Sequence, residues 1–301
     1  MFKKIGDQLY LFIINNHSGK GTKVWKQTLP LLLKMGIEFK SYLITKPDDL
    51  VDLKLDISTI NVKALVIIGG DGTVHHALRF IENTQVPLGI IPAGSGNDFA
   101  RALKIPKNSR KALRKILNGQ TERIDLIKVN DELCTTIVGV GFDAKVAEIT
   151  NHSRLKPWLN TFKLGKLAYV FGVLKGVFSY QPTDLTINID GKEKVFSNVW
   201  LIAIANTPYY GGGLKICPEA DKADGIVNIC VAHSLSRLEL LMFFPLVFLG
   251  KHTLHRCVAT DKGEVINISS KSTTTVQADG EMLGNTPVSI TVLKSHLNVI
   301  I

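Results

Sequence analysis

The chain has 301 residues, enough for two domains of ordinary size. Hydrophobic residues make up 45% and charged residues 21%, so the composition indicates a packed globular protein and excludes a disordered one. Lys and Arg number 36 against 26 Asp and Glu, and the net charge of +10 favours an anionic partner. The basic residues are scattered without an arginine-rich run, which argues against nucleic acid as that partner.

Cysteine spacing and apolar runs favour a reducing, aqueous compartment. The four cysteines lie far apart without a C-x-x-C pair, so we expect small core residues and not disulfide or metal partners. The longest uncharged apolar run, Leu240–Gly250, is too short to span a bilayer, and a core helix is expected there. The expected location is the cytoplasm, with peripheral contact to a membrane. The cysteines are Cys134, Cys217, Cys230 and Cys257.

The first predicted strand, Leu9–Ile14, runs into a short polar loop that contains a glycine. Small polar residues between a strand and a helix are typical of phosphate binding, and an ordinary capped loop is the alternative. A helix is expected over Thr22–Met35, with Pro30 bending or breaking it. The loop residues are Asn15, Asn16, His17, Ser18 and Gly19.

The next strands are expected over Phe39–Ile44, which Thr45 follows, and Val62–Ile68, with Asp48–Leu55 compatible with a helix between them. A glycine-rich turn comes at once after the second of these strands, and apolar residues from Val74 then recur at helical spacing. Such a turn lets backbone N–H groups approach an anion closely. The alternative is a turn whose glycines serve geometry alone. The turn residues are Gly69, Gly70, Asp71, Gly72 and Thr73.

A second glycine-rich turn follows the predicted strand Val86–Ile91. It contains Gly94 and Ser95, and either Asn97 or Asp98 is placed to cap the next helix. Strand, loop and helix thus occur three times in succession. This order predicts a parallel α/β sheet with its ligand at the carboxyl ends of the strands.

After a helix expected over Ser109–Leu117, the pattern changes to alternation of apolar and polar residues, which indicates antiparallel strands. We place a domain boundary near Glu132, so that residues 1–131 and 132–301 form the two domains, and leave open whether the last strand returns to the first. Helices are expected over Asp143–Asn151 and Lys166–Phe178. The strands are expected over Thr183–Asp190, Lys194–Phe196, Val199–Ala205, Ile226–Val231, Glu264–Ser269 and Val288–Leu293.

Both glycine-rich turns resemble those of known kinases. Gly69–Thr73 resembles the nucleotide-binding signature of diacylglycerol kinases, sphingosine kinases, NAD kinases and 6-phosphofructokinases. Pro92–Arg101 resembles the lipid-kinase pattern P-x-G-[ST]-x-N-D-[FL]-A-R, which NAD kinases and 6-phosphofructokinases lack. Asn15, Ser18 and Gly19 match the Asn-Pro-x-Ser-Gly loop of the diacylglycerol kinases, apart from its proline. The chain is therefore similar to bacterial diacylglycerol kinases over nearly its whole length.

This resemblance implies an N-terminal Rossmann-like parallel α/β domain and a C-terminal antiparallel β-sandwich with inserted helices. It also implies that the nucleotide contacts come from the loops after the strands of the first domain. His75 and His76 stand where the family usually has Asn-Glu, and a histidine can still donate to phosphate or ribose. The implied nucleotide-binding residues are Asn15, Asn16, His17, Ser18, Gly19, Thr45, Gly69, Gly70, Gly72, Thr73, His75, Gly94, Ser95 and Asn97.

The resemblance further implies a metal site and a general base. A Mg²⁺ would be held by the carboxylate of Asp224 and by carbonyl oxygens of Asp221 and Ile226, with a plain turn as the alternative. Glu281 would accept the proton of the acceptor hydroxyl, facing the nucleotide across an interdomain cleft, or would be an incidental glutamate after a turn. Asp71 would act with Mg²⁺ at the phosphates.

The implied function is an ATP-dependent lipid kinase with ATP and Mg²⁺ as cofactors, and diacylglycerol is the expected acceptor, giving phosphatidic acid. Lys156, Lys163 and Lys166 flank aromatic residues and are expected to touch an anionic lipid surface, or else to form a solvated helical face. The alternatives are a kinase of a sphingosine-like lipid or of NAD, and a catalytically weak regulatory protein that binds nucleotide or lipid. The acceptor lipid, the pathway and the oligomeric state, including a homodimer, stay open.

Overall fold

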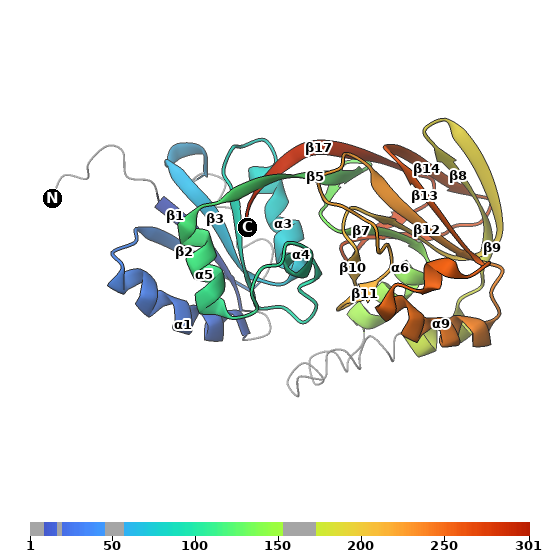
Figure 1. Cartoon of the computed structure of the whole chain (residues 1–301), viewed down its shortest axis with the longest axis horizontal. Coiled ribbons are helices and arrows are strands. Elements are labelled where there is room, and N and C mark those ends of the chain that lie inside the picture. Colours follow the sequence, from blue (N-terminus) through green and yellow to red (C-terminus); the bar gives the residue numbers. More distant parts are fainter. Residues whose placement is uncertain (1–8, 17–19, 46–56, 153–172) are drawn as a thin grey trace. The chain divides into compact units, whose positions relative to one another are not determined.

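The computed structural model describes residues 9–16, 20–45, 57–152 and 173–301 (Figure 1). The chain divides into two compact units, Met1–Ile124 with His296–Ile301, and Asp125–Ser295. The domain boundary expected near Glu132 lies shortly after this division and stays a prediction. The predictions that fall outside the described residues are the helix Asp48–Leu55, the first part of the helix Lys166–Phe178, and His17, Ser18, Gly19, Lys156, Lys163 and Lys166.

The first unit is built on a parallel sheet in the order β2–β1–β3–β4. Its central strands are apolar runs that are almost fully buried, as expected for a parallel sheet covered on both faces. The end of β17 (Val288–Ile300) adds a further parallel neighbour, with Val299 opposite Leu88 of β4. The strands are β1 (Leu9–Asn15), β2 (Phe39–Ile44), β3 (Val62–Gly69) and β4 (Leu88–Pro92).

Helices of this unit pack against the sheet and against one another. Ser109 Oγ donates to Gln27 Oε1 at 3.1 Å, which joins two of them, and Gly89 of β4 leaves room for Ile116. Pro30 does not break its helix, so of the two outcomes expected there only a bend is left, and the bend stays a prediction. Pro30 lies on the exposed side, where water can satisfy the carbonyl that loses its partner. The helices are α1 (Lys20–Lys34), α3 (Asp71–Ile81), α4 (Asp98–Ala102) and α5 (Ser109–Asn118).

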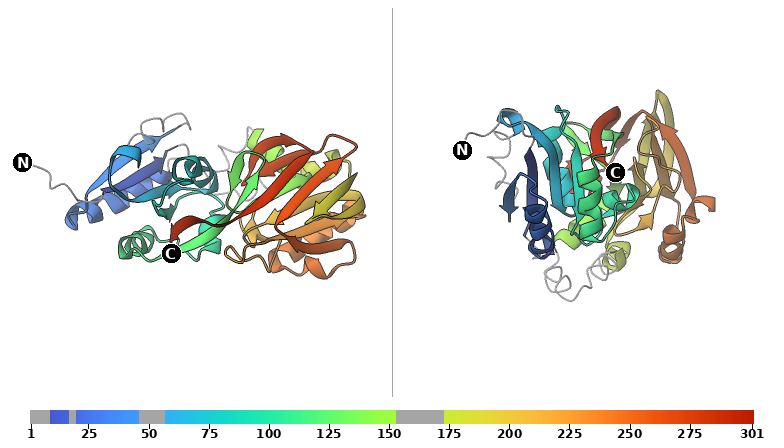
Figure 2. Two further views of the ribbon diagram at one scale, coloured as in Figure 1. Left: turned by 90° about the horizontal axis from the view of Figure 1, so that it is seen from above. Right: turned by 60° about the vertical axis from the view of Figure 1, so that its left-hand side comes forward.

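The second unit is an antiparallel β-rich fold, seen from two other directions in Figure 2. Its main strand order is β16–β15–β7–β9–β8–β14–β17, and β12 pairs with both β9 and β13. The predicted fold class, a parallel α/β half followed by an antiparallel half, is confirmed. The strands are β5 (Thr121–Val129), β6 (Glu132–Cys134), β7 (Ile137–Gly141), β8 (Thr183–Ile189), β9 (Lys192–Ala205), β10 (Tyr209–Tyr210), β11 (Leu214–Lys215), β12 (Val227–His233), β13 (Val258–Gly263), β14 (Val265–Ser270), β15 (Thr275–Ala278) and β16 (Glu281–Asn285).

The prediction of two short strands, Lys194–Phe196 and Val199–Ala205, is wrong, because β9 is a single strand. The residues between them break the apolar alternation, and Asn198 has a left-handed φ of 51°. Pairing holds the strand together nevertheless. Its first half pairs with β8, and its second half pairs with β7 and β12.

Alternate residues of β9 enter two different hydrophobic cores. Ile202 and Ile204 belong to an inner core formed between the strands, whereas Leu201, Ala203 and Ala205 belong to an outer core. The outer core is covered by α6 (Phe142–His152), α9 (Arg237–Leu249) and residues 173–179. All four cysteines are buried free thiols, which confirms their expected place in the core.

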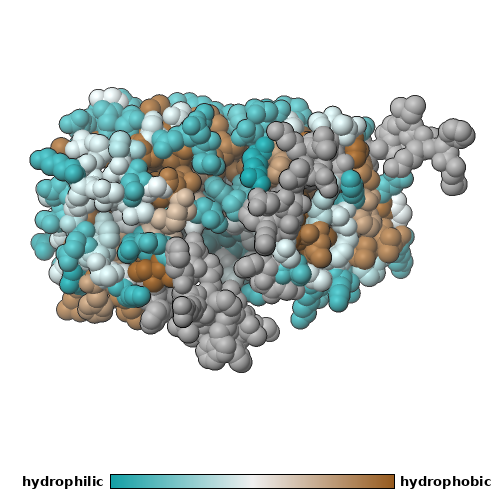
Figure 3. All heavy atoms as spheres, turned by 180° about the vertical axis from the view of Figure 1, so that it is seen from behind, coloured by the Kyte–Doolittle hydropathy of each residue, from teal (hydrophilic) through white to brown (hydrophobic). Residues whose placement is uncertain are grey.

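The apolar run from Leu240 does form a helix, as expected, but only one face of that helix packs on the core. This helix is α9, in which Phe243 is the one buried residue, while Met242 and Leu249 are exposed. The helix is apolar on all sides but covers only one face of the strands, so its other face points outward. Apolar side chains reach the lower left edge of Figure 3, the edge along which α9 runs when Figure 1 is seen from behind. Within the described residues, no helix is both long and apolar enough to cross a membrane.

Candidate active site

Three loops meet at the carboxyl edge of the parallel sheet. Asn15, at the end of β1, donates from Nδ2 to Thr73 Oγ1 at 2.7 Å and so joins the first loop to the start of α3. A Cβ added to Gly94 would lie 2.4 Å from the Cα of Gly70, and one added to Gly70 would lie 2.9 Å from the Cα of Gly94. The backbones of the second and third loops therefore touch, and only glycine permits this approach.

Asp71 braces these loops through both of its carboxylate oxygens. The N–H of Asp98 donates to Oδ2 at 3.1 Å, and the N–H of Phe99 donates to Oδ1 at 3.0 Å. These are the first amides of α4, which have no partner within their own helix. Asp71 is thus the cap of α4, supplied from the first turn of α3. Its expected contact with a metal at the phosphates stays a prediction.

Asn97 stands at the cap position of α4 but does not cap it, contrary to the prediction. Its φ of 53° is left-handed, and its side chain instead closes the loop onto Gly94. The Gly94 N–H donates to Asn97 Oδ1 at 2.8 Å, and Asn97 Nδ2 donates to the Gly94 carbonyl at 2.9 Å. Asp98 does not cap the helix either, since its carboxylate pairs with Arg101.

The other predicted nucleotide residues of the described chain lie around the same edge of the sheet, except one. The Ala93 N–H donates to the Gly69 carbonyl at 2.8 Å, and the exposed Thr45 directly follows β2. His75 is instead buried on α3, with its ring centroid 5.5 Å from that of His76. The nucleotide contacts of all these predicted residues, His75 included, stay predictions. The residues near the edge are Asn15, Asn16, Thr45, Gly69, Gly70, Gly72, Thr73, Gly94, Ser95 and Asn97.

The predicted metal loop lies in the second unit. Asp221 and Asp224 are both exposed, and each accepts a nearby backbone N–H: Ala223 donates to Asp221 Oδ1 at 3.1 Å and Ile226 to Asp224 Oδ1 at 3.2 Å. Among the residues described, no group of three or more His, Cys, Asp or Glu could hold a metal. One carboxylate with backbone carbonyls is nevertheless a donor set that suits Mg²⁺, which keeps several waters.

Asp125 holds this loop, although it belongs to none of the sequence motifs to which a function was assigned. It is 1% exposed in β5, and its carboxylate accepts the N–H of Gly225 at 2.7 Å and of Ser295 at 2.6 Å. Its own N–H donates to the Lys222 carbonyl at 2.7 Å. A charged residue inside an apolar strand was the available signal, because a buried carboxylate must have partners.

Glu281 begins β16 directly after a two-residue turn. Asp279 and Gly280 both have positive φ, at 51° and 91°, as a tight hairpin turn requires. The Asp279 carboxylate accepts the N–H groups of Thr135 at 2.8 Å and Thr136 at 2.9 Å, so it serves the fold. Glu281 is half-buried at the end of this braced hairpin.

A buried hydrogen-bond chain, formed by residues outside the predicted site, supports the same turn. The Gly280 N–H donates to Gln277 Oε1 at 2.7 Å, and Gln277 Nε2 donates to Asp143 Oδ2 at 2.8 Å. Burial raises the pKa of Asp143 to about 6, against the opposing hydrogen bonds from Gln277 and Tyr210. A Cβ on Gly139 would lie 1.9 Å from Asp143 Oδ2, so this glycine makes room for the carboxylate.

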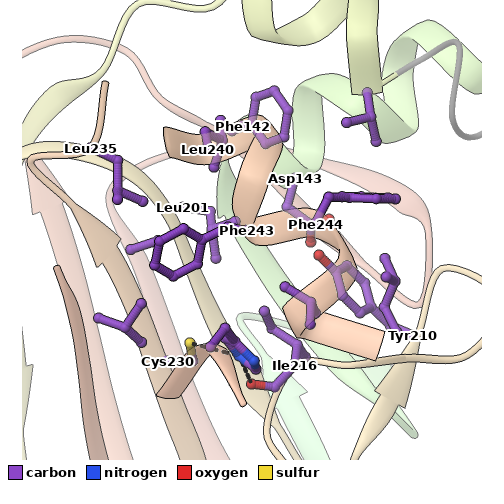
Figure 4. A pocket seen from close by; sticks show the side chains of 16 residues that line it. Phe142, Asp143, Leu201, Tyr210, Ile216, Cys230, Leu235, Leu240, Phe243 and Phe244 are labelled. Atoms are coloured by element: carbon purple, nitrogen blue, oxygen red, sulfur yellow. Dashed lines mark hydrogen bonds between the residues drawn. The ribbon is translucent and has the colours of Figure 1, made fainter. Parts of the chain in front are cut away.

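An apolar cavity lies beside Asp143 and beneath α9 (Figure 4). Its empty space, including the open mouth, is about 590 Å³. Most of the lining is aliphatic and aromatic, and the oxygens of Asp143 and Tyr210 face one another at one side. His252 Nε2 donates to the Ile216 carbonyl at 2.9 Å, while its Nδ1 has no hydrogen-bond partner among the described residues. The cavity is thus apolar with a few polar groups, as ligand pockets commonly are.

Two family models together match almost the whole chain. The diacylglycerol kinase catalytic domain matches residues 9–129, and the YegS C-terminal NAD kinase beta sandwich-like domain matches residues 136–301. A diacylglycerol kinase of Mycobacterium tuberculosis is 35% identical over 243 residues, which cover 79% of this chain and 76% of that protein. A diacylglycerol kinase of Staphylococcus aureus is 31% identical over 294 residues, 95% of this chain and 90% of that protein.

A solved structure agrees at the level of the fold. A diacylglycerol kinase from Bacillus anthracis has a TM-score of 0.73 at 19% identity, over 99% of this chain and 98% of that one. The chain belongs to the diacylglycerol kinase family and is thus a lipid kinase, an enzyme of the transferase class. Membership implies ATP, a lipid substrate and, in general, a divalent metal ion.

Proposed function

We propose that this protein transfers the γ-phosphoryl group of ATP to the hydroxyl of diacylglycerol at a membrane surface and so forms phosphatidic acid. The observation that carries the proposal is the contact between Gly70 and Gly94. It joins two glycine-rich loops beside the N-terminus of α3, where backbone N–H groups and the helix dipole favour phosphate. The loops around Asn15 and Thr45 provide further contacts to the nucleotide.

The transfer forms a bond between the acceptor oxygen and phosphorus while the bond from phosphorus to the ADP oxygen breaks. The proton of the hydroxyl passes to the Glu281 carboxylate, which is held at the end of the hairpin of β15 and β16. When bound, Mg²⁺ neutralises charge that develops during transfer. Asp224 and the carbonyls of Asp221 and Ile226 are the residues proposed to hold it, on the loop braced by Asp125.

The apolar cavity beneath α9 supports a lipid acceptor. It offers aliphatic and aromatic surface to an acyl chain, while Asp143, Tyr210 and His252 are its polar groups. A soluble acceptor such as NAD would make little use of such a lining. The cavity does not distinguish diacylglycerol from a sphingosine-like lipid, so the acceptor must be identified by its product.

A product assay tests this function. The purified chain is incubated with γ-labelled ATP, Mg²⁺ and mixed micelles that carry diacylglycerol, sphingosine or neither, and in a parallel tube with NAD. We expect label in phosphatidic acid and none in NAD phosphate. Label in another product would identify a different acceptor in place of diacylglycerol. The absence of any acceptor-dependent label would favour a regulatory protein that binds nucleotide or lipid.

A further inference from the structure

Helix α9 carries a continuous apolar stripe that the described part of the chain leaves exposed. Its charged residues, Arg237 and Glu239, are both in the first turn, and every later residue is apolar. A helix apolar on all sides is ordinarily buried. In α9 a stripe at spacings of three and four residues is exposed instead. Its members are Leu238 at 67%, Met242 at 59%, Leu246 at 37% and Leu249 at 65% exposure.

The opposite face of α9 covers the apolar cavity. Leu240, Phe243, Phe244 and Val247 line it from this helix, as Figure 4 shows for the first three. The helix is therefore a lid with apolar side chains on both sides. The outer stripe of such a helix suits a lipid environment, and its inner face suits an acyl chain. In the protein free in water, only the outer stripe is in contact with the solvent.

Neighbouring segments extend the apolar surface. Leu254, just after α9, is 86% exposed. Residues 173–179 are helical and line the same cavity as α9, because Val173 is one of its lining residues. On this second helix Phe178 is 67% exposed and Leu174 is 44% exposed. The exposed apolar residues thus belong to two helices that cover the same core.

The charges around this surface are mainly basic. Arg237, Lys251 and Arg256 are exposed at or near the ends of α9, and Lys175 is exposed on residues 173–179. Glu239 is the acid on α9, and its carboxylate accepts the N–H of Ser236 at 2.7 Å within the helix cap. Hydrogen bonding with Ser236 lowers the pKa of Glu239 most, and the nearby Arg256 and His255 lower it further. Apolar side chains rimmed by Lys and Arg are the arrangement of helices that lie in an anionic membrane interface.

We propose that α9 docks this protein on the surface of an anionic phospholipid bilayer, with the stripe Leu238, Met242, Leu246 and Leu249 inserted among the acyl chains. The choice of a bilayer over a protein partner rests on the proposed function, because a lipid acceptor must pass from a membrane to the cavity that α9 covers. The basic rim supplies the charge complementarity. The stripe consists of other residues than Lys156, Lys163 and Lys166, whose expected membrane contact lies outside the described residues.

Vesicle sedimentation without ATP or acceptor tests the docking surface. The full chain is mixed with vesicles of equal parts phosphatidylcholine and phosphatidylglycerol, and its affinity is compared with that of Met242→Asp/Leu249→Asp. The matched control is Leu33→Asp/Val195→Asp. Leu33 and Val195 are 64% and 67% exposed, and their replacement adds the same two negative charges away from α9. We expect roughly tenfold or more weaker binding for the α9 variant, and near wild-type binding for the control.

A serine pair, Met242→Ser/Leu249→Ser, removes the apolar groups without adding charge and covers the case in which the aspartate variant fails to fold. Equal vesicle affinity of the serine variant and the wild type would overturn the proposal. A wild-type dimer that this variant converts to a monomer would also overturn it, since a second copy would then cover α9. The assay contains no substrate, so a protein that docks but phosphorylates no lipid would refute the proposed function and leave the docking surface standing.

Discussion

At the residue scale, the acids Asp71, Asp279 and Glu281 all lie in or next to turns that contain glycine, but Glu281 differs from the other two in its surroundings. Asp71 and Asp279 each follow or precede glycine, and each accepts two backbone N–H groups from a distant segment. Both therefore hold loops together, whatever else Asp71 contributes. Glu281 lies half-buried beside Asp279, at the end of the hairpin that Asp279 anchors.

Replacing Glu281 with Gln tests the general base. The change keeps the shape and the hydrogen-bonding capacity but removes the basic oxygen. We expect turnover on diacylglycerol to fall by ~10²–10⁴-fold while ATP affinity, measured by calorimetry, stays near wild type. Glu193→Gln, on the exposed part of β9, is the control. If Glu281→Gln keeps more than about a tenth of wild-type turnover, Glu281 is not the base.

The buried Asp143 makes stability depend on pH. Its pKa is raised to about 6, so the folded chain holds this proton more tightly than the unfolded chain does. The contribution of protonated Asp143 to the free energy of unfolding is therefore complete at low pH and is lost as the pH rises through about 6. Asn does not titrate. As the pH rises from about 4.5 to about 7.5, the free energy of unfolding of Asp143→Asn should therefore increase by on the order of 2 kcal/mol relative to that of the wild type.

Urea unfolding at both pH values measures this difference. Asp131→Asn removes a carboxylate from an exposed position and serves as the control. A difference between Asp143→Asn and wild type that is the same at both pH values would show that Asp143 does not titrate in this range. The hydrogen bonds from Gln277 and Tyr210 to the carboxylate oppose the effect of burial, and the pKa of about 6 already includes their effect.

At the scale of the element, the approach of two loops depends on the absence of two Cβ atoms. Gly70 and Gly94 follow neighbouring strands, and their backbones are in contact because β3 and β4 are paired as far as Gly69 and Pro92. Asp71 then ties the next helix, α4, to α3. The proposed nucleotide site at this edge of the sheet thus depends on two paired strands and the helices that follow them, and not on a single loop.

Gly94→Ala tests this packing. Its methyl group would meet the Gly70 backbone, which cannot move without shifting α3, so we expect at least about tenfold weaker ATP binding and a stability loss of about 1–3 kcal/mol. Gly36→Ala is the control. Gly36 has a φ of 63° and no neighbour within 4 Å, so it should lose stability without losing ATP affinity. Equal ATP affinity in the two variants would place the nucleotide elsewhere.

The loop Asp221–Ile226 yields a test of the proposed metal site. Asp224→Ala removes the carboxylate and leaves carbonyls, which bind Mg²⁺ poorly alone, so half-maximal activity should require roughly tenfold or more Mg²⁺. Asp221→Ala keeps the backbone carbonyl that the proposal uses and should leave the Mg²⁺ titration unchanged. Matching titrations of Asp224→Ala and wild type would mean that the loop is only a turn.

At the scale of the whole molecule, two long strands belong to both compact units. β5 contains the division between Ile124 and Asp125, and β17 contains the division between Ser295 and His296. β17 pairs with β14 through its first residues and with β4 through its last. The chain therefore does not divide into two consecutive halves.

The sequence by itself determined the parallel and antiparallel halves, most strands, and the two glycine-rich turns. These follow from periodicity and turn chemistry, which depend on neighbouring residues. Only the tertiary structure decided that Asp71 caps α4, that Asp125 holds the Asp224 loop, and that Asp143 supports the turn before Glu281. Their partners are distant along the chain, and strand pairing alone brings them together. The exposure of α9 was also undecidable from its sequence, because an apolar helix has the same pattern whether protein or lipid covers it.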